Sequence, residues 1–127
     1  RRSSSAASDV YKRQVYPQGN YIRPADSKPY LVIGEVKYGK PILDRVITPK
    51  VSIGDASRCA LISMDSTLKS DLTVGPPIDF AVIKKDEIKI ASLKCLNMND
   101  PEFSKVCNQW SQGIFKIFDS FQRFDWE

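Results

Sequence analysis

The 127-residue chain has 42% hydrophobic and 27% charged residues, which limits it to one modest domain or to part of one. It contains no histidine, which excludes Ser-His and Cys-His nucleophile pairs, histidine metal sites and histidine proton shuttles. Cys59, Cys95 and Cys107 show no C-x-x-C spacing, so neither a zinc knuckle nor a disulfide framework is indicated, and a reducing compartment is favoured. The net charge of +4 taken alone suggests nucleic acid or an acidic membrane as partner.

Residues 1–14 carry most of this charge. They are rich in Ser, Ala and basic residues without an apolar run, which is typical of a disordered arm and not of a secretory signal. Residues 4–14 resemble the in-frame translation of a transposase-type sequencing adapter, so we expect residues 1–14 to be non-native; a genuine flexible arm is the alternative. Four basic residues and one acidic residue give this segment +3, which leaves +1 for residues 15–127 and no electrostatic case for nucleic acid.

The first part of the remaining chain is irregular. Prolines and glycines between residues 16 and 29 predict a loop with at most a short strand around Tyr21 and Ile22. The β-favouring run Tyr30–Ile33 predicts a strand buried on both faces. Pro41 and the apolar spacing from Ile42 to Ile47 then predict a helix of about two turns.

A long helix is predicted over residues 52–70, with Ser52 as its cap and Asp55 in its first turn. Small residues form a stripe along it, which would let the helix lie close to a sheet or to a second helix. The members of this stripe are Ala56, Cys59, Ala60, Ser63 and Thr67. Core packing explains them without any further role.

The last third of the sequence has the patterns of two strands and a helix. Residues 78–84 and 88–93 alternate as the two strands of an antiparallel hairpin. Asp100 followed by Pro101 is a strong helix start, and apolar residues at spacings of three and four continue to about Phe121. We expect the apolar face of this helix to pack internally, and packing between subunits is the alternative; its large members are Phe103, Trp110, Phe118 and Phe121.

This order of elements predicts an α+β chain with helices outside an antiparallel sheet. Only about three good strands are present, and a sheet of three strands facing a second layer would leave apolar surface open. We therefore expect residues 15–127 to be a partial domain, belonging to the C-terminal half of a larger fold.

Two segments carry a family resemblance. Residues 34–45, GEVKYGKPILDR, and residues 63–79, SMDSTLKSDLTVGPPID, resemble the bacterial proteasome-like ancestral beta subunit family, called Anbu. Residues 18–20 and the two tryptophans, Trp110 and Trp126, fit the same pattern in order. The resemblance implies an N-terminal nucleophile hydrolase with a four-layer αββα sandwich, of which this chain supplies the C-terminal half. It also implies assembly with like subunits into rings or open helical rings.

The resemblance implies a reaction that needs no histidine. An N-terminal Thr or Ser can use its own α-amino group as the base, since that amine titrates at about 7.7 to 8.0. In the family the nucleophile, an early aspartate and a tuning lysine lie in the half of the fold that this chain lacks. We therefore expect the chain alone to be inactive.

The resemblance places two groups of residues near that site. Asp71 and Ser70 are the candidates for supporting the nucleophile; Asp65, Ser66 and Thr67 compete for this role. The alternative is that Asp71 is only a turn residue at the end of a helix and that Ser66 is only a solvated residue.

Glu35, Lys37 and Tyr38 form the second group, which would position substrate or order its own loop. An exposed Glu–Lys pair is usually worth only about 0 to 1 kcal/mol, so it is weak evidence for a site. Two positions depart from the family pattern: Val36 stands where a small hydroxyl residue is expected, and Asp71 where Asn is expected.

The leading hypothesis is therefore a fragment of a cytoplasmic, proteasome-type Thr or Ser endopeptidase subunit. Its partners would be like subunits and, in the intact parent, a peptide substrate. No metal, cofactor, nucleic acid or membrane is expected. The alternative is a non-catalytic structural subunit of a ring or helical assembly. A third hypothesis, a basic nucleic-acid module, would require binding that persists without residues 1–14.

Overall fold

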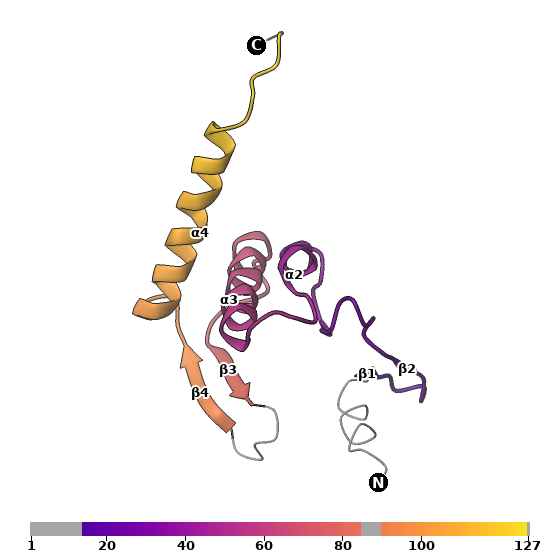
Figure 1. The fold of residues 1–127 in the computed structure, drawn as a ribbon. Coiled ribbons are helices and arrows are strands. Elements are labelled where there is room, and N and C mark those ends of the chain that lie inside the picture. The colour runs from indigo at the N-terminus through magenta and orange to yellow at the C-terminus, as the bar shows by residue number, and fades with distance from the viewer. Residues whose placement is uncertain (1–13, 85–89, 127) are drawn as a thin grey trace.

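The computed structural model describes residues 14–84 and 90–126 (Figure 1). Its elements confirm an α+β chain. In chain order they are β1 (Gln14–Val15), β2 (Tyr21–Ile22), α2 (Lys40–Val46), α3 (Ile53–Ser70), β3 (Ile78–Ile83), β4 (Ile90–Leu96) and α4 (Pro101–Asp119). The predicted arm up to residue 13 and the predicted turn between the hairpin strands lie outside the described residues.

The first two strands pair with each other. β1 and β2 are antiparallel, with Gln14 opposite Ile22 and Val15 opposite Tyr21, which confirms the short strand predicted at Tyr21. Gln14 was predicted to be the last residue of a disordered arm, but it takes part in this pairing.

The prediction of a strand at Tyr30–Ile33 is wrong, because these residues are irregular. A strand requires a neighbour to satisfy its backbone N–H and C=O groups, and no described strand lies beside this segment. The segment is fixed by side chains instead. The Tyr30 hydroxyl donates to the carboxylate of Asp44 in α2, and the Lys28 ammonium donates to the Asp44 carbonyl oxygen.

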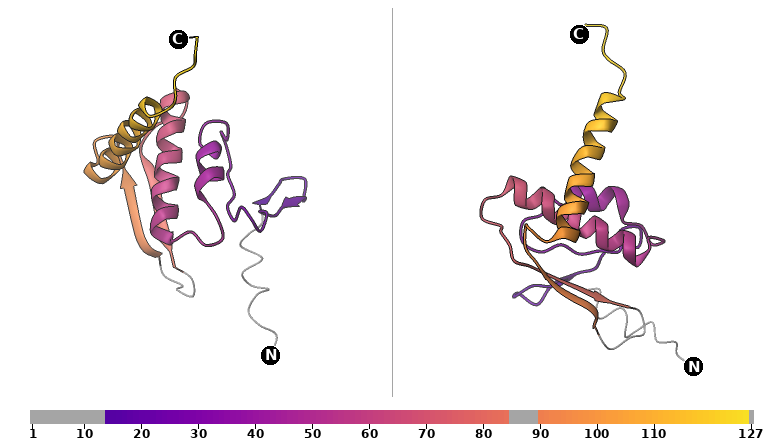
Figure 2. Two further views of the ribbon diagram at one scale, coloured as in Figure 1. Left: turned by 45° about the horizontal axis from the view of Figure 1, so that its top comes forward. Right: turned by 90° about the vertical axis from the view of Figure 1, so that its left-hand side faces the viewer.

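The two predicted helices of the middle region are present, with the predicted caps. Pro41 lies in the first turn of α2, and Ser52 Oγ caps α3 by accepting from the Asp55 amide at 3.0 Å. α2 lies beside α3 (Figure 2). Within the stripe of small residues, Cys59 and Thr67 are buried, whereas Ala60 is exposed. The stripe therefore serves the close helix packing that its composition predicts.

The hairpin and two helices form the core. β3 and β4 are antiparallel, with Ile78 opposite Leu96, and β4 ends three residues beyond the predicted strand. α3 and α4 lie on the same side of this hairpin (Figure 2). The buried cluster consists of Ile78, Leu96, Phe103 and Cys107, with Leu61, Met64, Leu68 and Phe80 packed against it. The outer face of the hairpin is exposed and includes Leu93, which is 68% exposed.

α4 begins as predicted, with Asp100 Oδ1 accepting from the amides of Glu102 and Phe103 at 3.0 and 3.2 Å. It ends at Asp119, two residues before the predicted end. Its first half packs in the core, but its second half projects beyond every other described element (Figure 1). Phe118 and Phe121 are therefore exposed, and their predicted internal packing is wrong. No helix in the described part of the chain combines the length and apolar character needed to cross a membrane.

Candidate functional site

The C-terminal end of α3 holds the first predicted site residue in a defined conformation. Asp71 is the residue after the helix, and its amide donates to the Thr67 carbonyl oxygen at 2.9 Å. Its Oδ1 accepts from the amide of Thr73 at 2.9 Å and from the Thr73 hydroxyl at 2.7 Å. Ser70, the last helical residue, is exposed.

The charge of Asp71 is stabilised by its neighbours. The two hydrogen bonds from Thr73 lower the pKa of Asp71 below its usual value, and the positive charge of Lys37 lowers it further. Asp71 is therefore an ionised hydrogen-bond acceptor at neutral pH. Lys37 comes from the second predicted group, so the structure brings a member of each group into electrostatic range.

A glycine explains how these two segments meet. Gly39 is buried against the last two turns of α3, at Ser63 and Thr67. A Cβ atom at Gly39 would lie 2.9 Å from the Ser63 carbonyl oxygen and 3.1 Å from Thr67 Oγ1. Only a residue without a side chain allows this close approach. The approach keeps the loop before α2 beside the C-terminal part of α3.

The loop of residues 34–38 orders its own charged residues. It starts at Gly34, whose φ of +82° lies in the left-handed region that favours glycine. Glu35 Oε1 accepts from the Lys37 amide at 2.8 Å, and the two side chains form a long ion pair of 4.0 Å. The Glu35 side chain is 26% exposed and that of Lys37 is 77% exposed. Tyr38 is exposed beside them.

Two of the three competing residues face other parts of the protein. Thr67 is buried, and its hydroxyl donates to the Ser63 carbonyl oxygen at 3.0 Å. Asp65 is 1% exposed and accepts from Lys69 Nζ at 2.8 Å. Its other oxygen, Oδ1, is buried and has no hydrogen-bond partner among the described residues. Burial, with a smaller contribution from Asp65, raises the pKa of the Cys107 thiol to about 11. Ser66, the third competitor, is half-buried.

Thr73 is a residue of this region that the sequence interpretation missed. The sequence did contain a signal for it, since an Asp followed two residues later by Thr after a helix commonly forms a turn closed by the Asp side chain. The link between Tyr30, Lys40 and Asp44 was also missed. Lys40 Nζ lies 2.6 Å from Asp44 Oδ2, and the group borders a pocket of about 400 Å³ that Val36 also lines.

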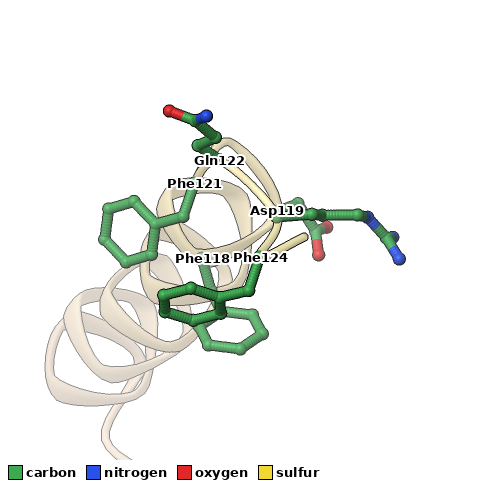
Figure 3. A pocket seen from close by; sticks show the side chains of 6 residues that line it. Phe118, Asp119, Phe121, Gln122 and Phe124 are labelled. Carbon is green, nitrogen blue, oxygen red and sulfur yellow. The ribbon is translucent and has the colours of Figure 1, made fainter. Parts of the chain in front are cut away.

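A second pocket lies at the far end of α4, away from the predicted site. It has a volume of about 370 Å³, and none of the predicted site residues lines it. Figure 3 shows its aromatic side chains, Phe118, Phe121 and Phe124, around the end of the helix. In the described ranges, no group of three or more acidic or cysteine side chains is placed to hold a metal ion.

Solved structures of similar proteins cover almost the whole chain. A Gly-1 mutant of Anbu from Hyphomicrobium sp. strain MC1 matches with 41% identity and a TM-score of 0.84, over 89% of this chain and 49% of that one. Anbu, the ancestral beta-subunit, from Yersinia bercovieri matches with 39% identity and a TM-score of 0.85, over 89% of this chain and 48% of that one. A helical assembly of the Anbu complex from Pseudomonas aeruginosa matches with 40% identity and a TM-score of 0.80, over 87% of this chain and 46% of that one.

The chain thus spans about half the length of these structures, as a C-terminal portion of such a subunit would. No protein-family model matches the chain, and no curated protein matches it.

Proposed function

Because the chain belongs to the Anbu, or ancestral beta-subunit, family, we propose that it contributes the supporting half of a proteasome-type N-terminal nucleophile peptidase. The parent subunit would have the four-layer αββα sandwich, would act on peptides in the cytoplasm and would assemble with like subunits. Its nucleophile would be a Thr or Ser at the mature N-terminus of the other half. The 127 residues alone would be inactive.

The observation that carries this proposal is the state of Asp71. Its carboxylate is fixed by Thr73 through Oδ1, and these hydrogen bonds, with a smaller contribution from the positive charge of Lys37, keep it ionised. None of the hydrogen bonds found among the described residues uses Asp71 Oδ2. That oxygen can accept a hydrogen bond from the α-amino group or the hydroxyl of a nucleophile placed against it, which would orient the amine as the base.

The loop of residues 34–38 would have a positioning role. Gly39 holds it against α3, and the internal Glu35–Lys37 contacts give it a defined shape. Lys37 and Tyr38 are both exposed, so they are available to a substrate or to the other half of the subunit.

A complementation experiment tests the proposal. The chain would be produced together with the N-terminal half of the Yersinia bercovieri relative, and the complex would be treated with a β-lactone or epoxyketone probe. We expect intact-mass analysis to show one covalent adduct on the N-terminal nucleophile and none on the chain alone. Asp71→Ala should slow labelling on the order of 100-fold, whereas Asp71→Asn should retain most of it, because Asn keeps a hydrogen-bonding oxygen.

The matched control is Asp119→Ala, which removes an exposed carboxylate at the far end of α4. It should label at the unsubstituted rate. Equal labelling rates for Asp71→Ala and Asp119→Ala would contradict the role given to Asp71. Labelling of the chain alone would contradict the division of the site between two halves.

A non-catalytic assembly subunit is the second candidate. The observation that favours it is the helical assembly formed by the Pseudomonas aeruginosa relative. In that case the complemented protein would form large particles, measured by light scattering, and would never react with either probe.

A further inference from the structure

A buried carboxylate lies where α3 packs against α4. Asp65 of α3 is 1% exposed, although aspartates are almost never fully buried unless they are paired. Its Oδ2 accepts from Lys69 Nζ at 2.8 Å, one turn further along α3, whereas its Oδ1 has no hydrogen-bond partner among the described residues. The charge of Asp65 also acts on the buried thiol of Cys107 in α4. The carboxylate therefore lies at the contact between the two helices.

Lys69 connects this carboxylate to α4. Its Nζ lies 3.3 Å from Ser111 Oγ, and Ser111 is one turn beyond Cys107 in α4. The ammonium group thus bonds to a side chain of each helix. The Lys69 side chain is 54% exposed and that of Asp65 only 2%, so the cation stays partly hydrated and the carboxylate does not. Lys69 supplies both the counter-charge of the buried acid and a polar link across the helix contact.

Stability alone does not explain a buried charge at this position. Removing a carboxylate from water costs free energy that the attraction of its partner often fails to recover, and apolar replacements of similar volume are often neutral or stabilising. The same contact already contains the apolar side chains of Leu61, Met64 and Leu68. A buried ionic group can instead select one arrangement of the elements that it joins.

The element that Lys69 can fix is the last turn of α3. Lys69 is in this turn, two residues before Asp71, whose amide donates to the Thr67 carbonyl oxygen at 2.9 Å. α3 lies between α2 and α4 (Figures 1 and 2). Gly39, in the loop before α2, approaches Thr67, and Ser111 of α4 bonds to Lys69. The turn that ends at Asp71 is therefore held from two neighbouring helical segments.

We propose that Lys69 is a positioning residue, whose bonds to Asp65 and Ser111 fix the last turn of α3 against α4 and thereby hold the Asp71 carboxylate in place. Its importance for the reaction rests on the proposed function, in which Asp71 supports the nucleophile. Lys69 itself touches no reacting atom. All the groups that make the link belong to this chain.

Two variants break the link in different ways. Ser111→Ala removes the bond to α4 and leaves the pair of Asp65 and Lys69 intact. Asp65→Leu combined with Lys69→Met removes both charges together, so that no unpaired charge stays buried. The matched control is Ser57→Ala, because Ser57 Oγ donates to the Ile53 carbonyl oxygen at 2.7 Å near the opposite end of α3. Urea titration should show that all three variants fold and that the double variant is at least as stable as the unsubstituted chain.

Amide hydrogen exchange in the full chain tests the positioning without any nucleophile. The amides of Asp71 and Thr73 should exchange at least about 5-fold faster in both link variants, the factor that corresponds to the loss of about one hydrogen bond. The Ala56 amide, which donates to the Ser52 carbonyl oxygen at the start of α3, should exchange at the unsubstituted rate. Unchanged exchange at Asp71 and Thr73 in both variants would overturn the proposal.

Probe labelling of the complemented complex, measured against pH, tests the consequence for the reaction. Both link variants should label about 10-fold more slowly, as expected when a supporting group is displaced. The pH of half-maximal rate should also fall, because a displaced Asp71 carboxylate no longer stabilises the protonated α-amine. Ser57→Ala should change neither quantity.

The two measurements separate the possible failures. Slower labelling with an unchanged pH of half-maximal rate would mean that the link is only structural, which contradicts a positioning role. Labelling at the unsubstituted rate in both link variants would also contradict it. An unsubstituted complex that reacts with neither probe would contradict the proposed peptidase function, and amide exchange would still decide whether Lys69 positions Asp71.

Discussion

At the scale of single residues, two glycines in this protein have opposite roles. Gly39 lies against the α3 backbone, where no Cβ atom fits, and this contact places Lys37 near Asp71. Gly113 lies in the middle of α4 with nothing within 4 Å of the position of a Cβ atom. Composition alone does not separate them, because the difference depends on what a distant segment places beside each residue.

Substituting each glycine by alanine should therefore have opposite effects on stability. Gly39→Ala should lower the free energy of unfolding by about 1 to 3 kcal/mol, because the added methyl group forces α2 away from α3. Gly113→Ala should raise it by up to about 1 kcal/mol, because alanine is the better helix former. Urea titration followed by circular dichroism measures both. A neutral Gly39→Ala variant would show that the loop does not depend on this close approach.

At the scale of elements, the helices and the hairpin could be predicted from signals within a few neighbouring residues. Ser52 and Asp100 cap their helices as predicted, since a cap and the turn it serves are adjacent in sequence. The strand predicted at Tyr30–Ile33 failed because a strand depends on a neighbour that local sequence does not specify. The replacement, a Tyr30–Asp44 hydrogen bond across 14 residues, has no local signature.

This link makes the attachment of residues 28–30 to α2 dependent on pH. Hydrogen bonds from Lys40 and from Tyr30 lower the pKa of Asp44 below its usual 3.8. A lowered pKa in the folded state means that the carboxylate contributes stability above the unfolded pKa, and that this contribution is lost as the pH falls through the folded value. The stabilisation is thus present at neutral pH and disappears in acid.

Asp44→Asn should accordingly lower the urea midpoint at neutral pH, and the difference from the unsubstituted chain should shrink as the pH is reduced from about 7 to about 3. Asp119→Asn, on the exposed far end of α4, serves as the control and should leave the midpoint unchanged at both values. A difference for Asp44→Asn that is independent of pH would mean that the lost contact is not ionic.

At the scale of the whole molecule, large apolar side chains are exposed in many of the described segments, and two groups of them lie on the hairpin and at the end of α4. The outer face of the hairpin exposes Leu93, and the end of α4 with the residues after it exposes Phe118, Phe121, Phe124 and Trp126. Open apolar surface of this kind marks interfaces. It agrees with a chain that spans about half of the length of the related structures.

The charge of the whole chain can also be tested. Residues 1–13 contribute +3 of the net +4, so their deletion should remove most of any retention on a heparin column and any binding to a single-stranded oligonucleotide. Elution salt and fluorescence anisotropy measure these effects, and the urea midpoint of the deleted chain verifies folding. Oligonucleotide binding that survives the deletion would revive the nucleic-acid hypothesis.

The sequence by itself determined the helices, the hairpin and the position of Asp71 at a helix end, because each rests on signals within a few neighbouring residues. It also determined that histidine chemistry is excluded. The tertiary structure decided that the positive charge of Lys37 acts on Asp71, that Tyr30 bonds to Asp44 and that the end of α4 stays exposed. The first two features join residues that are far apart in the chain, and the third depends on the absence of a covering element among those described. Tertiary packing, not local sequence, therefore decides all three.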